Sequence, residues 1–404
     1  MTSRSDLKPL EDRGPLRVMF LVTSLPVGGA ETLLLNLVRR MDPDHFAPSI
    51  CCLKELGPLG EELATETRVY SRLIHGKYDL GVVRRLARLL RRQRVDAVVT
   101  VGAGDKMFWG RIAARLAGVP VICSALHSTG WPDTIGRLNR LWFLTRWTDA
   151  FIGVAEPHAR HLVEVEHFPA EKVRVIPNGV DVQQFRPSTV GTRVRSTLGI
   201  DPQAPVVAIV AALRPEKNHQ QFLRVAAEVR KRLPAARFLI VGDGPQRPML
   251  EQLADELGLN ESVLFLGTRD DIPDLLAACN VFTLTSKIEA NPVSILEAMA
   301  SGKPVVAPRV GSIGESVSDG VTGYLTTPGD DDEVVERVTE LLSDHPLAER
   351  LGAAGREAVC ARWSLEAMVT GYEDLLKSVY NQKCDRRRII RPAATAEALR
   401  QWTR

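Results

Sequence analysis

The chain has few of the features that mark several common classes of protein. Its 404 residues include only six cysteines, with no Cys-x-x-Cys pair and no histidine cluster beside them, so the usual spacing of zinc ligands is missing. The same scarcity favours a reduced, cytosolic compartment. The formal net charge is +3, without the concentrated basic excess of a nucleic-acid-binding protein. We expect neither a metal site nor a nucleic-acid partner.

Long hydrophobic runs are also missing. Residues 1–15 are charged and contain prolines, and they lack the apolar segment of a signal peptide. The apolar stretch at residues 16–25 is too short to span a membrane and is typical of a buried strand. We therefore expect a cytoplasmic protein, with any membrane contact peripheral, at the inner face of the cell membrane.

What the chain does have is a regular alternation of short apolar runs and helical patterns. Two series of apolar runs are separated by a stretch rich in proline, glycine, threonine and arginine. The first covers residues 17–25, 47–53, 96–102, 119–127, 149–155 and 173–179, and the second covers 206–213, 237–244, 262–267, 281–286 and 303–308. Such alternation predicts two doubly wound α/β domains, each with a mostly parallel sheet.

The composition also predicts where the domains begin and end. We expect an N-terminal extension (1–15), a first Rossmann-like domain (16–183), a linker (184–204), a second Rossmann-like domain (205–363) and a C-terminal helix with a basic tail (364–404). The tail either crosses back to the first domain or is disordered. Ligands of open α/β sheets bind at the carboxyl ends of the strands, so two facing domains predict a ligand in the cleft between them.

Two features lie at the predicted carboxyl ends of strands in the first domain. Gly28 and Gly29 permit a tight turn, and Glu31 falls in the first turn of the next helix, where free N–H groups suit an anion or a sugar. His127 ends a later strand. Each feature has a structural alternative: an ordinary strand-to-helix turn, and a histidine that only packs.

In the second domain, cations and acids lie at the corresponding positions. Arg214 and Lys217 follow a buried strand and precede a helix, which suits a diphosphate, although solvated loop charges would give the same pattern. Glu289 and Glu297 flank the start of a short helix that begins near Pro292. Periodicity alone makes Glu297 an ordinary exposed residue, whereas the topology brings both acids to the cleft, where each could hold a vicinal diol.

Taken together, these segments resemble a retaining glycosyltransferase of family 4 with the GT-B fold. The resemblance extends over nearly the whole chain, and the seven residues between Glu289 and Glu297 match the family hallmark. The segments that carry it are "LVTSLPVGGAE", "VIPNGVD", "RPEKNH", "VGDGP", "FLGTRDDIPDLLAACNVFTLTS", "EANPVSILEAMASGKPVVA" and "DGVTGYLTTPGD". It implies transfer of a sugar from a nucleoside-diphosphate sugar, UDP- or GDP-linked, to an acceptor hydroxyl, with no cofactor and no metal.

The resemblance also implies the residues of the site. Those implied in catalysis are His127, Arg214, Lys217 and Glu289, and those implied in donor binding are Gly28, Gly29, Arg214, Lys217, Gly267, Arg269, Glu289, Ala290, Asn291, Pro292, Val293 and Glu297. Within this set Glu289 would bind hydroxyls of the transferred sugar and Glu297 those of the ribose. The two cations would neutralise the diphosphate. Gly267 and Arg269 would border the base.

The chain departs from the family pattern at several positions. Ala290 replaces the usual glycine, Asn291 stands where a bulky apolar residue is frequent, and Ser128 stands where aspartate is common. A methyl group at position 290 disfavours a positive φ, so the loop beside the sugar is expected to differ. These changes bear on the sugar and the acceptor rather than on the fold or the reaction.

One helix of the first domain is strongly basic. Residues 79–94 carry six arginines beside an apolar face. Either this is a surface helix packed on its sheet, or its charge attracts it to anionic lipid. The acceptor stays open: a glycan, a lipid-linked molecule or a small molecule, with bacterial exopolysaccharide or cell-envelope assembly the commonest setting of the family.

Other functions also stay open from the sequence. A nucleotide-sugar epimerase of the same fold would turn over the donor alone, and a non-catalytic protein would bind the sugar nucleotide without transfer. An NAD-dependent oxidoreductase is disfavoured, because residues 241–245 contain Gly-x-Gly without a third glycine at Rossmann spacing.

Overall fold

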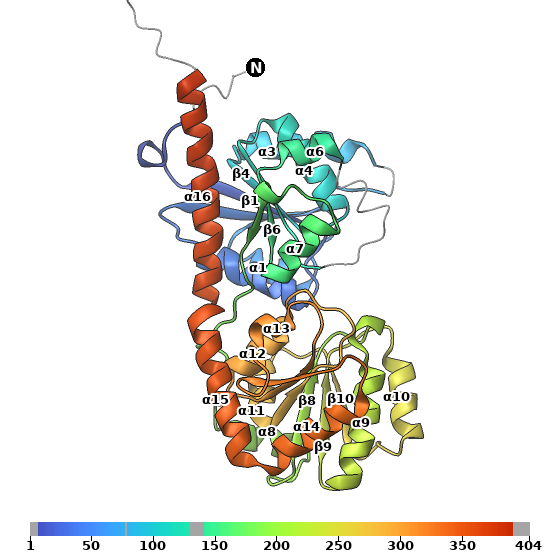
Figure 1. Ribbon diagram of the computed structural model, residues 1–404. Helices are drawn as coiled ribbons and strands as arrows, with labels where there is room; N and C mark the ends of the chain where they lie inside the picture. The colour runs from blue at the N-terminus through green and yellow to red at the C-terminus, as the bar shows by residue number, and fades with distance from the viewer. Residues whose placement is uncertain (1–6, 77–78, 129–140, 391–404) are drawn as a thin grey trace, which may run out of the picture.

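A computed structural model describes residues 7–76, 79–128 and 141–390, with side chains up to residue 385. These residues form two α/β domains, one above the other in Figure 1, with the long helix α16 (Leu365–Ile390) running along one side of the first domain. Each domain is a twisted parallel sheet covered by helices on both faces. The predicted fold class, two doubly wound Rossmann-like domains, is confirmed.

The first domain contains a seven-stranded sheet with the order β3-β2-β1-β4-β5-β6-β7. Its strands are β1 (Leu16–Val22), β2 (Phe46–Cys52), β3 (Arg68–Tyr70), β4 (Ala97–Val101), β5 (Val121–Ala125), β6 (Ala150–Gly153) and β7 (Val173–Val175). Its helices are η1 (Leu10–Asp12), α1 (Gly29–Arg40), α2 (Pro58–Leu63), α3 (Gly81–Arg92), α4 (Asp105–Ala117), α6 (Trp142–Trp147), α7 (Glu156–Glu164) and η2 (Ala170–Lys172). The short edge strand β3 was not expected from the sequence.

The central strand β1 explains why this sheet is buried on both sides. Val18 and Phe20 point into one hydrophobic cluster, and the alternate residues Met19 and Leu21 point into another on the opposite face. A strand buried on both faces needs a continuous apolar run rather than an alternating one. The run at residues 17–25 therefore places β1 at the centre of the sheet.

The second domain contains a six-stranded sheet with the order β10-β9-β8-β11-β12-β13. Its strands are β8 (Val206–Val210), β9 (Arg237–Val241), β10 (Val263–Gly267), β11 (Val281–Thr283), β12 (Val305–Pro308) and β13 (Gly323–Thr326). Its helices are α8 (Gly191–Thr197), η3 (Pro215–Lys217), α9 (His219–Arg232), α10 (Arg247–Glu256), α11 (Ile272–Ala278), α12 (Val293–Ala300), α13 (Ile313–Ser316), α14 (Asp331–Ser343) and α15 (His345–Arg362).

The segment expected to be a linker is largely integrated into the second domain. It contains α8, and Phe185, Ile200 and Ala204 lie in the hydrophobic core of that domain. The Arg195 guanidinium fastens it further by donating to the carbonyl oxygen of Ala278 at 2.9 Å. The sequence did not indicate this packing, because these apolar residues are isolated and follow no helix or strand periodicity.

The chain passes between the domains at two places that lie side by side. Val180 and Ser364 form a parallel bridge, and a Cβ at Gly179 would lie only 2.6 Å from the carbonyl oxygen of Ser364. After the second crossing, α16 returns along the first domain, where Tyr372 and Leu376 enter its hydrophobic core.

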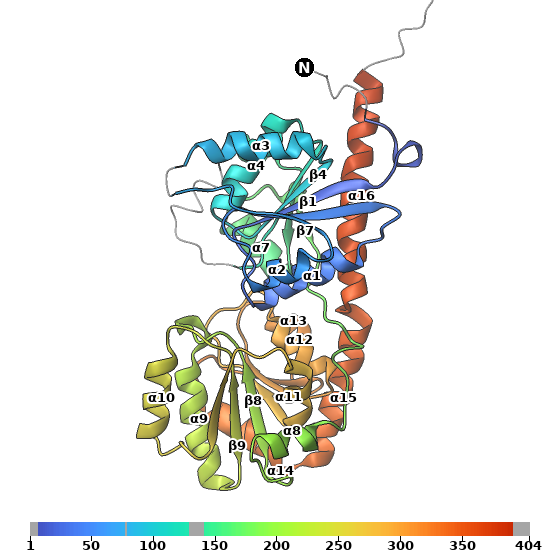
Figure 2. The same cartoon turned by 180° about the vertical axis from the view of Figure 1, so that it is seen from behind.

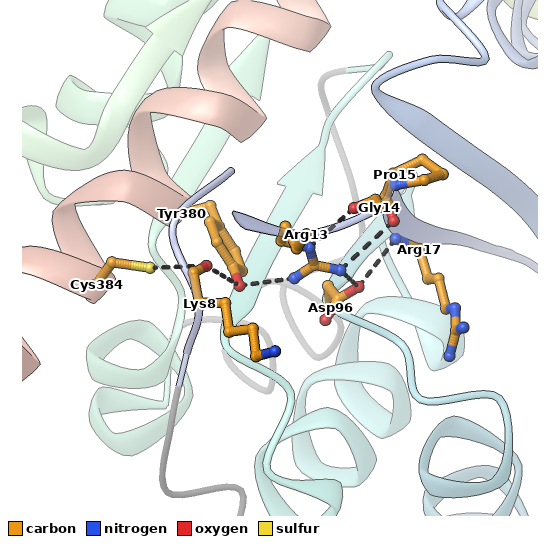
Figure 3. A network of polar contacts seen from close by, with 8 residues as sticks. All are labelled: Lys8, Arg13, Gly14, Pro15, Arg17, Asp96, Tyr380 and Cys384. Atoms are coloured by element: carbon orange, nitrogen blue, oxygen red, sulfur yellow. Dashed lines mark hydrogen bonds and ion pairs between the residues drawn. The ribbon is translucent and has the colours of Figure 1, made fainter. Parts of the chain in front are cut away.

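The N-terminal extension is attached to the far part of α16 (Figure 3). The Arg13 guanidinium donates to the Tyr380 hydroxyl oxygen at 2.6 Å and pairs with the Asp96 carboxylate at 2.5 Å. The Tyr380 hydroxyl in turn donates to the carbonyl oxygen of Lys8 at 3.0 Å. The two ends of the described chain are thus joined on the first domain.

No helix within residues 7–76, 79–128 and 141–390 combines the length and the apolar character that crossing a bilayer requires.

Candidate active site

Each sheet has one topological switch point, where the connections after two neighbouring strands run toward opposite edges of the sheet. In the first domain this point lies between β1 and β4, and in the second between β8 and β11. A crevice forms at the carboxyl ends of such a strand pair and is the usual ligand site of an open α/β sheet. The loop after β1 meets the second domain, because a Cβ at Gly29 would lie 3.7 Å from the Val293 Cβ. The two crevices therefore belong to one interdomain site.

In the second domain, the loops after β8 and β11 bring two predicted residues together. The Lys217 ammonium nitrogen lies 2.6 Å from a carboxylate oxygen of Glu289, which is buried. The loops are tied to each other by the Lys287 amide, which donates to the Glu216 carbonyl oxygen at 2.8 Å. Removing either partner would leave a charge in a partly buried site without compensation.

The backbone of the Glu289 loop is held by a close contact with Gly311. This glycine has a φ of 54°, and a Cβ there would lie 1.7 Å from the Glu289 carbonyl oxygen. Any side chain at position 311 would displace the loop. Ala290 is absent from the described non-glycine residues with positive φ, so this loop forms without the conformation that a glycine at position 290 would permit.

Arg214 lies at the start of η3 on the same loop as Lys217, and it differs from Lys217 in being exposed. Within the described part of the chain its guanidinium makes no hydrogen bond or ion pair. The loop therefore presents one cation already paired with a carboxylate and one available to a ligand.

Glu297 lies on α12 and is only partly exposed, unlike the ordinary exposed residue that periodicity alone indicated. Burial raises the pKa of its carboxyl group from 4.5 to about 7. The reason is the position of α12, which packs against α15 of its own domain and against α1 of the first domain. Two sides of the helix are covered, whereas the periodicity argument allowed for one.

Two asparagines connect the domains beside this helix. The Asn178 side-chain amide donates to the carbonyl oxygen of Asn291 at 2.9 Å. The Asn291 side chain is buried, and neither of its amide atoms has a hydrogen-bond partner in the described residues. The position that departs from the family pattern thus lies at the contact between the domains.

His127 follows β5 in the first domain and is half-buried. Burial lowers the pKa of its imidazole to about 4, and the nearby Lys106 charge acts in the same direction while the Asn178 side chain opposes it. His127 is therefore neutral near pH 7 and can exchange hydrogen bonds with a sugar hydroxyl without carrying charge.

The segment expected to border the base lies at the end of β10. Gly267 has a φ of 66°, and a Cβ there would lie 3.4 Å from the Arg247 guanidinium. Arg269 is exposed and bound to the Asp271 carboxylate by two hydrogen bonds of 2.8 and 2.6 Å. Arg269 was selected from the sequence, and Arg247 was not. Arg247 is the first residue of α10, the helix after "VGDGP", and only its short spacing from that turn could have indicated it.

Among the described residues, no three His, Cys, Asp or Glu side chains gather as a metal site would require. That the reaction needs neither metal nor cofactor stays a prediction.

Family models match both halves of the chain. Residues 27–184 match the model "Glycosyltransferase Family 4", and residues 192–358 match "Glycosyl transferases group 1". The chain is also 30% identical over 306 residues to the GDP-mannose-dependent alpha-(1-6)-phosphatidylinositol monomannoside mannosyltransferase of Mycolicibacterium smegmatis. This match covers 70% of the chain and 76% of the relative.

Two further similarities extend over more of the chain. It is 29% identical over 336 residues to the UDP-Gal:alpha-D-GlcNAc-diphosphoundecaprenol alpha-1,3-galactosyltransferase of Escherichia coli, covering 80% of the chain and 86% of the relative. Among solved structures, Anabaena Alr3699/HepE in complex with UDP and glucose has a TM-score of 0.80 and 25% identity, covering 90% of this chain and 100% of that one.

Proposed function

The chain belongs to glycosyltransferase family 4, an enzyme family with nucleotide-sugar donors, and from this premise we propose that it is a retaining glycosyltransferase of bacterial exopolysaccharide or cell-envelope assembly. The observation that carries the proposal is the ion pair between Lys217 and Glu289 at the β8–β11 crevice, with Arg214 beside it. A diphosphate and a sugar are the two groups that such neighbouring charges suit.

The proposed chemistry follows from the charges of the site. The bond between the sugar and the diphosphate breaks through an oxocarbenium-like transition state, and negative charge grows on the leaving diphosphate. Lys217 and Arg214 stabilise that charge, which is commonly the largest catalytic effect available to such a site. Glu289 holds sugar hydroxyls and keeps Lys217 in position. The acceptor hydroxyl attacks the same face, and its proton passes to the leaving phosphate.

The donor is proposed to be a UDP- or GDP-linked sugar, because relatives are named for both nucleotides. Glu297 would hold the ribose hydroxyls, and Gly267 with Arg269 would border the base. A thermal-shift panel of UDP-, GDP-, ADP- and CDP-sugars identifies the donor. NMR of the sugar first released by donor hydrolysis then tests retention: we expect the anomer of the donor, and the opposite anomer would contradict a retaining mechanism.

The acceptor setting rests on the relatives and on one surface. Two relatives are named for acceptors joined to a lipid, a phosphatidylinositol mannoside and a diphosphoundecaprenol. Helices α3 and α6 lie at the end of the first domain away from the second domain (Figure 1). Exposed residues there suit a membrane surface. They are Arg84, Arg88, Arg91 and Arg92 of α3, and nearby Trp142 and Leu116, which are 75% and 56% exposed.

The apolar face of α3 does not itself supply this contact. Val82, Leu86 and Leu90 are buried against the sheet, so α3 packs as an ordinary surface helix and only its charge is available to lipid. We propose peripheral binding at the cytoplasmic face of the membrane. Co-sedimentation with phosphatidylglycerol vesicles should fall at least fivefold in Arg84→Gln/Arg88→Gln but not in Arg232→Gln on the second domain. Equal binding by both variants would contradict the contact.

A further inference from the structure

The crevice of the first domain contains a lysine that no sequence motif singled out. Lys106 is the second residue of α4, which begins just after β4, one of the two strands that flank the crevice. Its side chain turns back over the end of that strand, since a Cβ at Gly102 would lie 3.0 Å from its Cε and 3.2 Å from its Nζ. The ammonium group therefore lies by the strand end rather than out in solvent.

Three neighbouring strands bring charged or titratable groups around this ammonium. Glu31 follows β1, Lys106 follows β4 and His127 follows β5. The charges of Glu31 and the adjacent Asp105 act on Lys106, and the Lys106 charge acts on His127. The Glu31 carboxylate is folded back toward its own helix start, because a Cβ at Gly28 would lie 2.5 Å from one of its oxygens. Among the described residues, no ion pair joins Glu31 to Lys106.

Lys106 is partly buried, and its charge has no direct partner in the described part of the chain. It makes no hydrogen bond or ion pair in the described part of the chain, and burial lowers its pKa. Other lysines in comparable settings are compensated: Lys172 donates to the carbonyl oxygens of Thr145 and Thr148 at 2.9 and 2.8 Å. A desolvated ammonium without a partner is unfavourable, and an anion that enters the crevice would relieve it.

The donor does not account for this cation. The diphosphate is assigned to Arg214 and Lys217 in the second domain, whereas Lys106 belongs to the β1–β4 crevice of the first domain. The neighbouring His127 interacts with the Asn178 side chain, and its buried Nδ1 has no hydrogen-bond partner among the described residues. An acceptor bound in this crevice would meet both groups.

We propose that Lys106 and His127 form an anion subsite for the acceptor, so that the enzyme glycosylates molecules that carry a phosphate or carboxylate close to the reacting hydroxyl. This rests on the proposed function, because it assigns the first-domain crevice to the acceptor. A charged group held there would orient the hydroxyl toward the sugar bound by Glu289. Lys106 is a specificity determinant in this scheme and takes no part in breaking the donor bond.

Matched acceptors test the subsite. Transfer is measured with three pairs that differ in charge: inositol and inositol 1-phosphate, N-acetylglucosamine and its 1-phosphate, and malamide and malate. Comparison of the phosphates with malate distinguishes a phosphate subsite from a carboxylate one. We expect the charged member to be preferred at least tenfold, the preference to vanish in Lys106→Met, and Lys106→Arg to retain most of it. Equal use of both members, or a preference that survives in Lys106→Met, would overturn the proposal.

A second measurement needs no productive acceptor. With the enzyme saturated with its nucleoside diphosphate, acylation of individual lysines is followed by mass spectrometry in the presence of inorganic phosphate or malate. We expect at least threefold slower labelling of Lys106 and no change at Lys54, an exposed lysine of the same domain. Unaltered labelling of Lys106 with both anions would refute the subsite.

Donor binding separates this proposal from the proposed function. The dissociation constant of the nucleotide sugar should be the same in the wild type and Lys106→Met, and a tenfold weaker value would assign Lys106 to the donor instead. If no nucleotide sugar is bound or hydrolysed by the wild type, the proposed function itself fails. Normal donor hydrolysis without any anion preference refutes only the subsite.

Discussion

The environment of Glu297 makes a prediction in which stability and ligand binding change in opposite directions. Its pKa of about 7 means that the folded protein holds a proton between pH 4.5 and 7 that the unfolded chain has already released. Stability falls with rising pH wherever the folded state binds more protons, so the free energy of unfolding should decrease across this window. Above pH 7 the carboxylate is ionised in both the folded and the unfolded state, so the free-energy cost of its burial no longer changes with pH.

The size of this penalty follows from the two pKa values. A change from 4.5 to about 7 corresponds to about 3 kcal/mol, at 1.36 kcal/mol for each pKa unit. The side chain keeps some contact with solvent, which reduces the expected value to about 1–2 kcal/mol. Glu297→Gln removes the charge at nearly constant volume and should raise the melting temperature by about 2–6 °C at pH 8. At pH 5 it should have little effect.

The same substitution should weaken the nucleotide. If the carboxylate accepts hydrogen bonds from the ribose hydroxyls, its loss costs about 1.5–3 kcal/mol, or at least tenfold in the dissociation constant. Differential scanning fluorimetry at pH 5 and pH 8, and calorimetric titration with the nucleoside diphosphate, measure the two effects. Glu349→Gln, at an exposed position of α15, is the matched control and should change neither.

Particular outcomes would refute this reasoning. A Glu297→Gln protein that is equally destabilised at both pH values would mean that the carboxylate is stabilised by partners rather than penalised by burial. An unchanged dissociation constant would remove the ribose from this residue. Stabilisation at pH 8 together with weaker nucleotide binding is the combination expected if burial penalises the carboxylate and Glu297 holds the ribose.

Three further predictions concern the loops and the core. Lys217→Ala should lower the turnover of donor hydrolysis at least a hundredfold, since one lost stabilising donor is worth about 3–4 kcal/mol; near wild-type turnover would contradict its role. Gly311→Ala should displace the Glu289 loop and abolish detectable donor turnover, because the new methyl group meets a backbone oxygen; an active variant would show that the loop tolerates it. Burial lowers the pKa of His158 and His219 to about 4, so the unfolded chain binds protons near pH 6.5 before the folded protein does, and stability should fall as the pH drops from 6.5 to 4; a melting temperature that is constant over this range would refute it.

The fold could be predicted from the sequence because its signal is local. Strands buried on both faces leave continuous apolar runs, and their alternation with helices dictates a parallel sheet. The strand β3 was missed because it is an edge strand whose residues are exposed or half-buried, so it leaves no apolar run in the sequence. The segment around α8 was read as a linker because Phe185 and Ile200 are far apart in sequence and pack only against residues of other elements.

The site could be predicted only in part, for a related reason. The spacing of Glu289 and Glu297 was visible in the sequence, but the environment of Glu297 depends on helices from both domains that cover α12. The pairing of Lys217 with Glu289 depends on the order of β8 and β11 in the sheet, which the sequence does not state. Lys106 went unnoticed for the same reason: its importance comes from the adjacency of β1 and β4, which are far apart along the chain.

The two adjacent crossings at Val180 and Ser364 also bear on how the protein is made. Because α16 supplies Tyr372 and Leu376 to the core of the first domain, that domain is discontinuous, and the second domain is inserted within it. A ribosome that synthesises the chain from its N-terminus must therefore complete the whole second domain before the first can close its core. The second domain should therefore fold first, and the first domain should complete its core only after α16 has been synthesised.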